Sequence, residues 1–275
     1  MHVAPVALPT LQRARGRAEV AVSHDGNGTR LDRLFQQGCA KAVLPRTHGP
    51  VPEAVLLNTS GGVTGGDRLD WRLAAGPAAE FVATTQAAER VYRSSGGAAH
   101  VETRLELGAG ARLDWLPQET ILFDGGRLER RLKVDMAANA RLLALETLVL
   151  GRVAMGETVA SGLLSDQWRI RREGVLVHAE ALRLEGDLAR AIAGPATLSG
   201  ARAFATLVAA APGAETRLDQ ARALLADCPV SAAATAKPGL LILRLLAPEL
   251  RPLRAALVAF LLAFRAAPLP RVWSS

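Results

Sequence analysis

The chain has 275 residues, of which 49% are hydrophobic and 4% aromatic, and its formal net charge is +7 at pH 7. A chain of this length can bury a substantial core as one large domain or two small ones. Most of the positive charge is arginine, spread among Asp and Glu rather than gathered in a basic stripe with interleaved aromatics. The composition therefore argues against a nucleic-acid binder and is compatible with a basic surface that meets an acidic protein partner.

The N-terminal segment and the cysteines together predict a cytoplasmic protein. Residues 1–20 lack the long apolar core of a signal peptide. The longest apolar run, residues 255–264, is too short to span a bilayer. Cys39 and Cys228 stand alone, without zinc spacing or a C-x-x-C motif, as expected in a reducing compartment. We therefore expect no membrane partner.

The first distinctive element is the segment LLNTSGGVTGGDRLDW, residues 56–71, in which a strand-like run leads into four glycines. Gly61 and Gly66 have the spacing of a phosphate-binding loop, but Asp67 stands where such a loop needs a lysine. The residues that follow alternate between apolar and charged, which predicts a strand. A phosphate site would need a helix N-terminus at that point. The sequence therefore argues against a nucleotide site here.

Most of the chain from residue 15 to residue 190 has the pattern of short β-strands. In residues 101–107, apolar and charged side chains alternate, which is typical of a half-buried strand. Residues 168–184 predict a hairpin that turns at Glu173–Gly174. A second strand with one apolar face is indicated by Leu128, Leu132, Val134 and Met136.

A weak internal repeat runs through this strand-rich part. Three segments share one plan, in which a strand leads through a small-residue turn into another strand. Their turns lie at Gly76, Gly110 and Asn139, about 30 residues apart. Such a repeat favours layers that stack into a helicoid or an elongated sandwich. The alternative is that any β protein repeats strand, turn and strand.

The pattern changes after Gly194–Pro195, and residues 195–275 mix strand-like and helical spacing. Near the C-terminus, Pro252 fits the first turn of a helix and Pro268 follows its end. We expect this helix to pack on the core, with partner binding as the alternative. No linker is visible, so residues 1–275 are expected to form one domain. The helix is predicted by apolar residues at three- and four-residue steps, namely Leu250, Leu253, Leu257, Leu261 and Phe264.

The search for catalytic chemistry gives no acid–base pair. Ser60 does not lie in a nucleophile elbow, and the histidines show no metal-binding spacing. His178 alternates with apolar neighbours, as a structural histidine in a strand does. Glu146 lies in the apolar run LLALETLVLG, where a carboxylate is costly to bury without a partner. Such carboxylates can have a structural role, as a salt bridge, at an edge strand or as a turn cap. The alternative is that they line a polar channel or a weak metal site.

Several motifs resemble one known family over essentially the whole chain. They occur in family order, and residues 187–238 carry the weakest resemblance. The family is that of the UreD (also UreH) urease accessory proteins. The motifs are LFQQGCAKAVLPR, LNTSGGVTGGDRL, ATTQAAERVYRS, LDWLPQETILFDGGRLERRLKVDM, LETLVLGRVAMGE and the terminal PRVW.

This resemblance implies an all-β dominated fold, with a helicoid or two-layer sheet architecture and a few short α-helices, one near the C-terminus. It implies no enzymatic activity and no tightly bound cofactor. The protein would be a scaffold that binds the urease apoprotein and recruits the F-type accessory protein and, through it, the G-type GTPase. Together these proteins insert nickel into urease, and a polar passage through the UreD-like protein would carry transient nickel.

The resemblance also suggests roles for individual residues. Nickel in transit needs weak, exchangeable oxygen or imidazole ligands. The glycine loop, Gly61, Gly62, Gly65 and Gly66, would be a structural turn that uses positive φ, and Asp67 would either cap it or belong to the passage. Tyr92 and Arg93 would be structural anchors or partner contacts. The candidate passage residues are Asp67, Glu119, Glu146, His178 and Glu180.

Two rival hypotheses remain at the level of sequence. The first is a hydrolase or lyase that uses carboxylates of unassigned role. The second is a general protein-interaction module with no part in metal handling.

Overall fold

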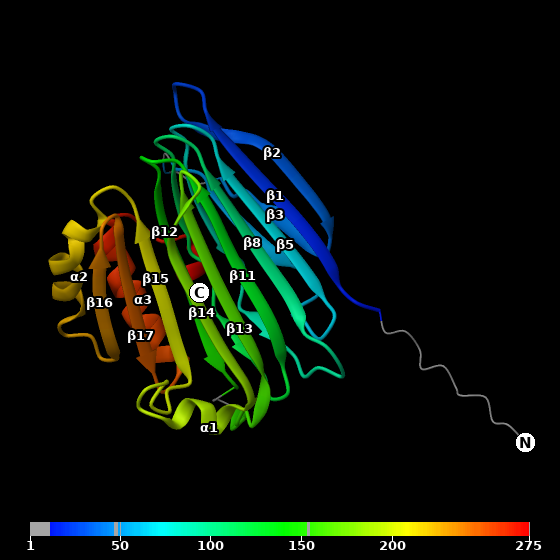
Figure 1. The fold of residues 1–275 in the computed structure, drawn as a ribbon. Helices are drawn as coiled ribbons and strands as arrows, with labels where there is room; N and C mark the ends of the chain where they lie inside the picture. Colours follow the sequence, from blue (N-terminus) through cyan, green and yellow to red (C-terminus); the bar gives the residue numbers. More distant parts are fainter. Residues whose placement is uncertain (1–11, 47–48, 50, 153–154, 275) are drawn as a thin grey trace, which may run out of the picture.

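The protein is built from two β-sheets packed face to face (Figure 1). The computed structural model describes residues 12–46, 49, 51–152 and 155–274. Within these residues one sheet has seven strands and the other has ten, and the helices are few. The predicted all-β dominated, two-layer architecture with a few short helices is thus confirmed. Residues 1–11, on which part of the prediction about a signal peptide depends, lie outside the described residues.

The seven-stranded sheet has the order β14-β13-β11-β8-β5-β1-β2. Its strands are β1 (Arg15–His24), β2 (Thr29–Gly38), β5 (Arg68–Ala75), β8 (Ala99–Leu107), β11 (Arg127–Met136), β13 (Ser161–Arg172) and β14 (Val175–Asp187).

The ten-stranded sheet has the order β16-β17-β15-β12-β9-β6-β4-β3, and β10 pairs with β12 and with β7. Its strands are β3 (Ala40–Val43), β4 (Glu53–Asn58), β6 (Glu80–Thr85), β7 (Glu89–Val91), β9 (Arg112–Trp115), β10 (Thr120–Leu122), β12 (Arg141–Leu150), β15 (Ala203–Ala210), β16 (Ser231–Lys237) and β17 (Leu240–Ala247). The α-helices are α1 (Leu188–Ala193), α2 (Leu218–Leu225) and α3 (Leu250–Arg265).

The chain alternates between the two sheets in its central part. Strands β5, β8 and β11 lie parallel in one sheet, and each is followed by a strand of the parallel set β6, β9 and β12 in the other. The turns between them stack, since the Ala78 N–H donates to the Ala109 carbonyl (2.8 Å) and the Gly110 N–H to Asn139 Oδ1 (2.7 Å). The predicted repeat is therefore confirmed as one turn of a helicoid per unit.

Strands with alternating apolar and charged residues bury their apolar side chains, as predicted. In β5, Leu69, Trp71 and Leu73 are buried between the sheets, and their charged neighbours are less buried. Strand β12 is different, because nearly all its residues are buried. One face of β12 packs against the seven-stranded sheet and the other against α3, so the strand reads as a nearly continuous apolar run.

The hairpin and the C-terminal helix are also confirmed. Strands β13 and β14 are joined at Glu173 and Gly174, which have φ values of 50° and 74°. Helix α3 lies against the ten-stranded sheet (Figure 1) and buries the predicted face, including Leu253, Leu257 and Leu261. In the part of the chain that the structure describes, no helix is both long and apolar enough to cross a membrane.

Candidate functional site

The space between the two sheets contains a buried cluster of charged side chains, which we call the central ion network: Arg130, Glu146 and Asp166. Arg130 lies on β11 and Asp166 on the neighbouring strand β13, whereas Glu146 comes from β12 of the opposite sheet. The Arg130 guanidinium donates from Nε (3.0 Å) and Nη2 (2.9 Å) to the two oxygens of Asp166. Its Nη1 donates to Glu146 Oε2 at 2.5 Å. One arginine thus ties the two sheets together.

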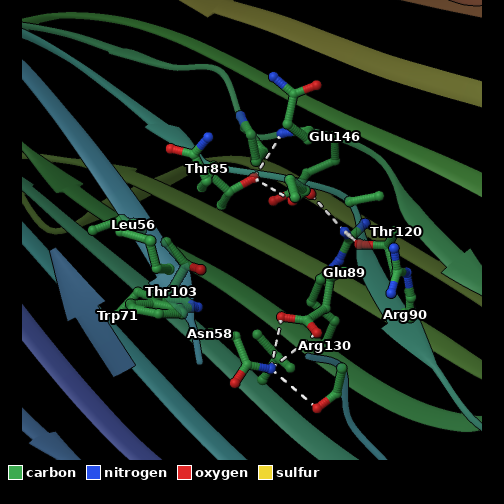
Figure 2. A pocket seen from close by; sticks show the side chains of 18 of the residues that line it. Leu56, Asn58, Trp71, Thr85, Glu89, Arg90, Thr103, Thr120, Arg130 and Glu146 are labelled. Atoms are coloured by element: carbon green, nitrogen blue, oxygen red, sulfur yellow. Dashed lines mark hydrogen bonds and ion pairs between the residues drawn. The ribbon is translucent and has the colours of Figure 1, made fainter. Parts of the chain in front are cut away.

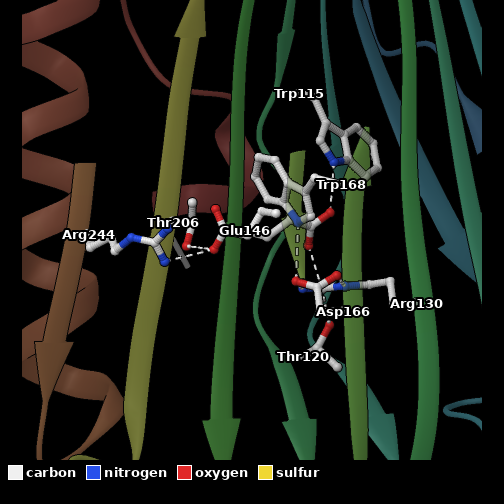
Figure 3. Close-up of polar contacts among 9 residues, drawn as sticks. Trp115, Thr120, Arg130, Glu146, Asp166, Trp168, Thr206 and Arg244 are labelled. Carbon is white, nitrogen blue, oxygen red and sulfur yellow. Dashed lines mark hydrogen bonds and ion pairs between the residues drawn. The ribbon is translucent and has the colours of Figure 1, made fainter. Parts of the chain in front are cut away.

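Neighbouring polar groups complete the hydrogen bonding of this network (Figure 3). The Trp115 indole N–H donates to Glu146 Oε1 at 3.0 Å, and the Trp168 indole N–H donates to Asp166 Oδ2 at 3.2 Å. Arg130 Nη1 also donates to the hydroxyl of Thr120 at 3.2 Å. Buried charges are tolerated when they are paired and hydrogen-bonded in this way.

The network holds two carboxylates but a single guanidinium, and this imbalance has an electrostatic consequence. The side chains of Arg130, Glu146 and Asp166 are 5%, 6% and 9% exposed. Burial raises the pKa of Glu146, and the neighbouring Asp166 charge acts in the same direction, although Arg130 opposes both. The carboxylates in turn hold the pKa of Arg130 above its ordinary value. Arg130 is therefore a permanent cation at the centre of the molecule.

A cavity of about 200 Å³ lies next to this network (Figure 2). Its inner end is formed by Arg130 and Glu146, and its other end by Asn58 and Glu89 beside the glycine loop. The Asn58 amide donates to both Glu89 oxygens, at 3.0 and 3.3 Å. Burial raises the pKa of Glu89 to about 7, although the Asn58 hydrogen bond opposes the shift. Glu89 therefore changes its charge near neutral pH.

A second polar cluster lies further across the interior, towards strands β14 and β17. Thr206 on β15 is the direct neighbour of Glu146 in the sheet and donates to Glu180 Oε1 at 3.4 Å. Arg244 of β17 donates to the same Glu180 oxygen at 2.8 Å. His178 Nε2 lies 3.6 Å from Glu180 Oε2, and neither atom has a hydrogen-bond partner among the described residues. We call this set the His178 cluster.

The structure places the five predicted passage residues in different surroundings. Glu146 belongs to the central ion network, and His178 and Glu180 lie together in the second cluster. Asp67 lies apart from them and accepts from the backbone N–H groups of Ala14 and Thr64, both at 2.8 Å. It therefore makes the turn-capping contacts that were the alternative for this residue.

Glu119 lies on another side of the ten-stranded sheet. Its carboxylate pairs with Arg254 of α3 at 3.2 Å, and it does not line the 200 Å³ cavity. The five candidates are therefore not brought into one row by the fold.

The backbone of the glycine loop packs closely against the VYRS segment, residues 91–94. Gly62 and Gly66 have φ values of 146° and 90°, and a Cβ on Gly62 would lie 2.4 Å from the Tyr92 ring. The Tyr92 hydroxyl donates to the Gly61 carbonyl at 3.1 Å. A Cβ on Gly65 would overlap Ser94, at 2.0 Å from its hydroxyl oxygen. Arg93 forms an ion pair with Asp124. These contacts are those of a structural turn and its anchors.

Several polar residues of the interior were not singled out from the sequence, among them Arg130, Asp166, Asn58 and Glu89. Arg130 lies two residues from both Leu128 and Leu132, on the predicted apolar face of this strand. Asp166 and Trp168 follow the same alternation in β13. A charged residue in the apolar register of a strand is the signal that would have identified both Arg130 and Asp166. Glu89 carries no such pattern, because β7 is only three residues long, and Asn58 is the last residue of β4.

The arrangement can offer carboxylate and imidazole groups to a passing cation, but it contains no ready-made metal cage. Among the described residues, no group of three or more His, Cys, Asp or Glu side chains is placed to hold a metal ion. The central carboxylates are already bonded to Arg130. Such groups suit weak and exchangeable binding better than permanent coordination.

Comparisons with known proteins give a consistent result along the chain. A family model described as "UreD urease accessory protein" matches residues 14–274. The chain is similar to the protein named "Urease accessory protein UreD" from Xanthobacter autotrophicus, at 51% identity over 264 residues, covering 96% of this chain and 91% of that one. A protein of the same name from Methylobacterium sp. is 50% identical over 280 residues, covering 100% of this chain and 99% of that one.

Proposed function

Because this chain belongs to the UreD family of urease accessory proteins, we propose that it acts in urease maturation as a scaffold without catalytic activity. In this role it binds the urease apoprotein and recruits the F-type accessory protein and, through it, the G-type GTPase. The assembly then inserts nickel into urease. Family membership supports the role in urease maturation, and the names of the partners come from the resemblance described above.

The observation that carries the nickel part of the proposal is the polar interior of an otherwise apolar sandwich. Glu89, the central ion network and the His178 cluster follow one another between the sheets. Burying these groups costs free energy that an apolar core would not require. We therefore propose that the interior offers successive weak ligands to nickel on its way to urease.

Arg130 sets a condition on this passage. Its guanidinium occupies the space between Glu146 and Asp166, so a divalent cation meets a fixed positive charge there. Transit through the centre requires the Arg130 side chain to leave Glu146, which would free one carboxylate for the ion. With Arg130 bonded to Glu146, the structure corresponds to the closed state of the proposed passage.

The alternative, a carboxylate-dependent hydrolase or lyase, has less support from the geometry. The 200 Å³ cavity is smaller than the usual range of about 300–1,000 Å³ for small-molecule sites. Its carboxyl groups are bonded to Asn58, Arg130 and Trp115.

The test is urease activation in a reconstituted system. Apo-urease, the F-type protein, the G-type GTPase, GTP, bicarbonate and nickel are mixed with this chain or without it. We expect binding to apo-urease and the F-type protein in a pull-down, and activation that is lost when the chain is omitted. Absence of binding by the folded protein would overturn the scaffold proposal.

A set of variants tests the passage separately. Glu146→Gln and His178→Asn are expected to keep the pull-down intact and to slow activation. Glu106→Gln, at an exposed position of β8, removes a carboxylate of the same kind and serves as the matched control. If all three variants activate urease at the wild-type rate, the passage is wrong, although the scaffold role stands.

A further inference from the structure

A cluster of arginines lies at the edge of the ten-stranded sheet near the end of α3, away from the polar interior. We call it the arginine cleft: Arg112, Arg141, Arg217 and Arg265, around the single carboxylate of Asp114. Arg112 and Arg141 are direct neighbours on the parallel strands β9 and β12. Like charges placed opposite each other on adjacent strands destabilise a sheet. On the other side of Arg112 the register places Glu80 of β6, so this row carries one arginine, Arg141, in excess.

The one carboxylate in the cleft is already neutralised. Arg265 donates from Nε to Asp114 Oδ2 at 2.7 Å, and both side chains are almost completely buried. Arg112 approaches the same carboxylate only at 3.5 Å. Arg141 is exposed and forms no ion pair with any residue that the structure describes. Four arginines around Asp114 thus leave the cleft with a net positive charge, and Arg141 carries the charge that no described carboxylate pairs with.

Arg217 is held rigidly in the wall of the cleft. Its guanidinium lies 3.6 Å from the centre of the Phe264 ring and donates to the Phe264 carbonyl at 2.6 Å and to Gln220 at 2.9 Å. Burial lowers the pKa of Arg217, and the nearby charge of Arg112 acts in the same direction. A side chain fixed in this way loses little conformational entropy when it binds an anion.

The shape of the cleft indicates the size of its ligand. The cleft has a volume of about 390 Å³. It meets two neighbouring hollows at Arg112, one of about 470 Å³ that includes Arg141 and Glu80, and one of about 870 Å³ that includes Arg46 and Arg271. Glu80 and Glu53 are the carboxylates of these hollows besides Asp114. A groove of this extent suits an extended chain better than one small anion.

We propose that the arginine cleft binds an acidic segment of a partner protein, whose carboxylates pair with Arg112, Arg141 and Arg217. Bidentate pairing between guanidinium and carboxylate gives such a contact both strength and orientation. The net charge of +7 attracts an acidic partner from a distance. This inference depends neither on nickel transit nor on urease activation, and it is tested on the isolated chain.

The experiment measures the binding of a fluorescein-labelled oligoglutamate peptide to the intact protein by fluorescence anisotropy. We expect the wild type to bind, and its affinity to fall as salt is added, because screening weakens contacts between exposed charges. The double variant Arg112→Gln/Arg141→Gln should bind about tenfold more weakly. The single variant Arg141→Gln, which removes no ion pair to a described residue, should bind about threefold more weakly and keeps the test valid if the double variant unfolds.

The matched control is Arg131→Gln. Arg131 is an exposed residue of β11 in the other sheet, so this change lowers the net charge equally without touching the cleft. We expect it to leave the affinity unchanged. An equal loss of affinity in Arg131→Gln and Arg141→Gln would overturn the proposal, since net charge alone would then explain the binding. So would inorganic phosphate binding as tightly as the peptide, which would indicate a site for a free oxyanion.

Discussion

The two faces of the ten-stranded sheet are built on opposite principles. Along β12 the outer face, under α3, is mostly apolar: Leu143, Leu145 and Val149 belong to one hydrophobic cluster with Leu257 and its neighbours in the helix. The inner face uses the same strand but places Glu146 among the apolar residues, where it is bonded to Arg130 and Trp115. Adjacent residues of one strand, Leu145 and Glu146, thus belong to two different kinds of interior.

The difference between the two faces shows which contacts hold the sheet in the fold and which polar groups go beyond that need. Apolar contacts supply most of the packing between α3 and the sheet. The buried polar groups of the outer face include Thr147 and the Asp114–Arg265 ion pair at the end of the helix. Buried ion networks seldom add stability over an apolar core of equal volume. The three-residue ion network of the inner face has no counterpart along β12 on the outer face, and in our proposal it serves nickel transit, because sequences depart from the simplest packing mainly at functional sites.

The largest effect is expected from breaking the central ion network. Arg130→Met leaves Glu146 and Asp166 buried without their cation, and we expect the free energy of unfolding to fall by about 4 kcal/mol, measured by urea denaturation. Arg131→Met, at the exposed neighbouring position, should change it by less than about 0.5 kcal/mol. Equal effects of the two variants would contradict the contrast between the two faces.

A triple replacement sharpens the same comparison. Arg130→Met combined with Glu146→Leu and Asp166→Leu makes the inner face resemble the outer one. We expect this protein to regain most of the lost stability but not to support nickel-dependent urease activation.

On the outer face, the expected loss depends on volume instead of charge. Leu257 is 1% exposed, and Leu257→Ala should lower the free energy of unfolding by about 3 kcal/mol, through lost apolar contact and the cavity left behind. Leu262→Ala on the same helix, where the side chain is 44% exposed, is the control and should have a much smaller effect. Urease activation should follow stability alone in both variants.

The raised pKa of Glu89 predicts that part of the free energy of unfolding depends on pH, and this part comes from the inner face of the sheet. Its pKa is about 7 in the folded protein, against an ordinary value of 4.5. Below pH 4.5 the group is neutral in both states, and stability is lost as the pH rises towards 7, because the unfolded chain ionises more readily. At about pH 8, Glu89→Gln should be more stable than the wild type by about 3 kcal/mol.

The measurement for Glu89 is urea denaturation of both proteins at about pH 4 and about pH 8. The difference between wild type and variant should nearly disappear at the lower pH, since Gln can still accept the Asn58 hydrogen bond. A difference that does not change with pH would show that Glu89 ionises as an ordinary carboxyl group does.

The smallest effect concerns Asp67, which lies outside the interior. Asp67→Asn keeps the shape of the side chain but can accept only one of the two backbone N–H groups, so we expect a loss of about 1 kcal/mol. Urease activation should be unchanged once stability is taken into account. A specific loss of activation would return Asp67 to the passage.

The sequence predicted those features that depend on neighbouring residues. Alternation identified β5, β8 and β11, the Glu173–Gly174 turn identified the hairpin, and the spacing of leucines identified α3. These are local patterns, which act over a few residues.

What could not be predicted depends on how distant strands align. Arg130 meets Glu146 because β11 and β12 lie in opposite sheets, and their facing is fixed by the whole sandwich. Glu89 is half-buried where the short strand β7 pairs with β10, and no local pattern shows this. The same limit explains why Glu119 and Glu146, both near apolar runs, have different surroundings.

The alternation of the chain between the sheets also determines how the molecule can assemble during folding. Strands β5, β8 and β11 pair side by side, yet each is separated from the next by a strand of the opposite sheet. Each parallel pairing must close a loop of about 30 residues, a cost that is met before the contact is gained. Neither sheet can therefore be completed before the strands of the other sheet that lie between its own strands in the sequence. The chain is expected to fold slowly, with strand edges exposed to other chains until both sheets are complete.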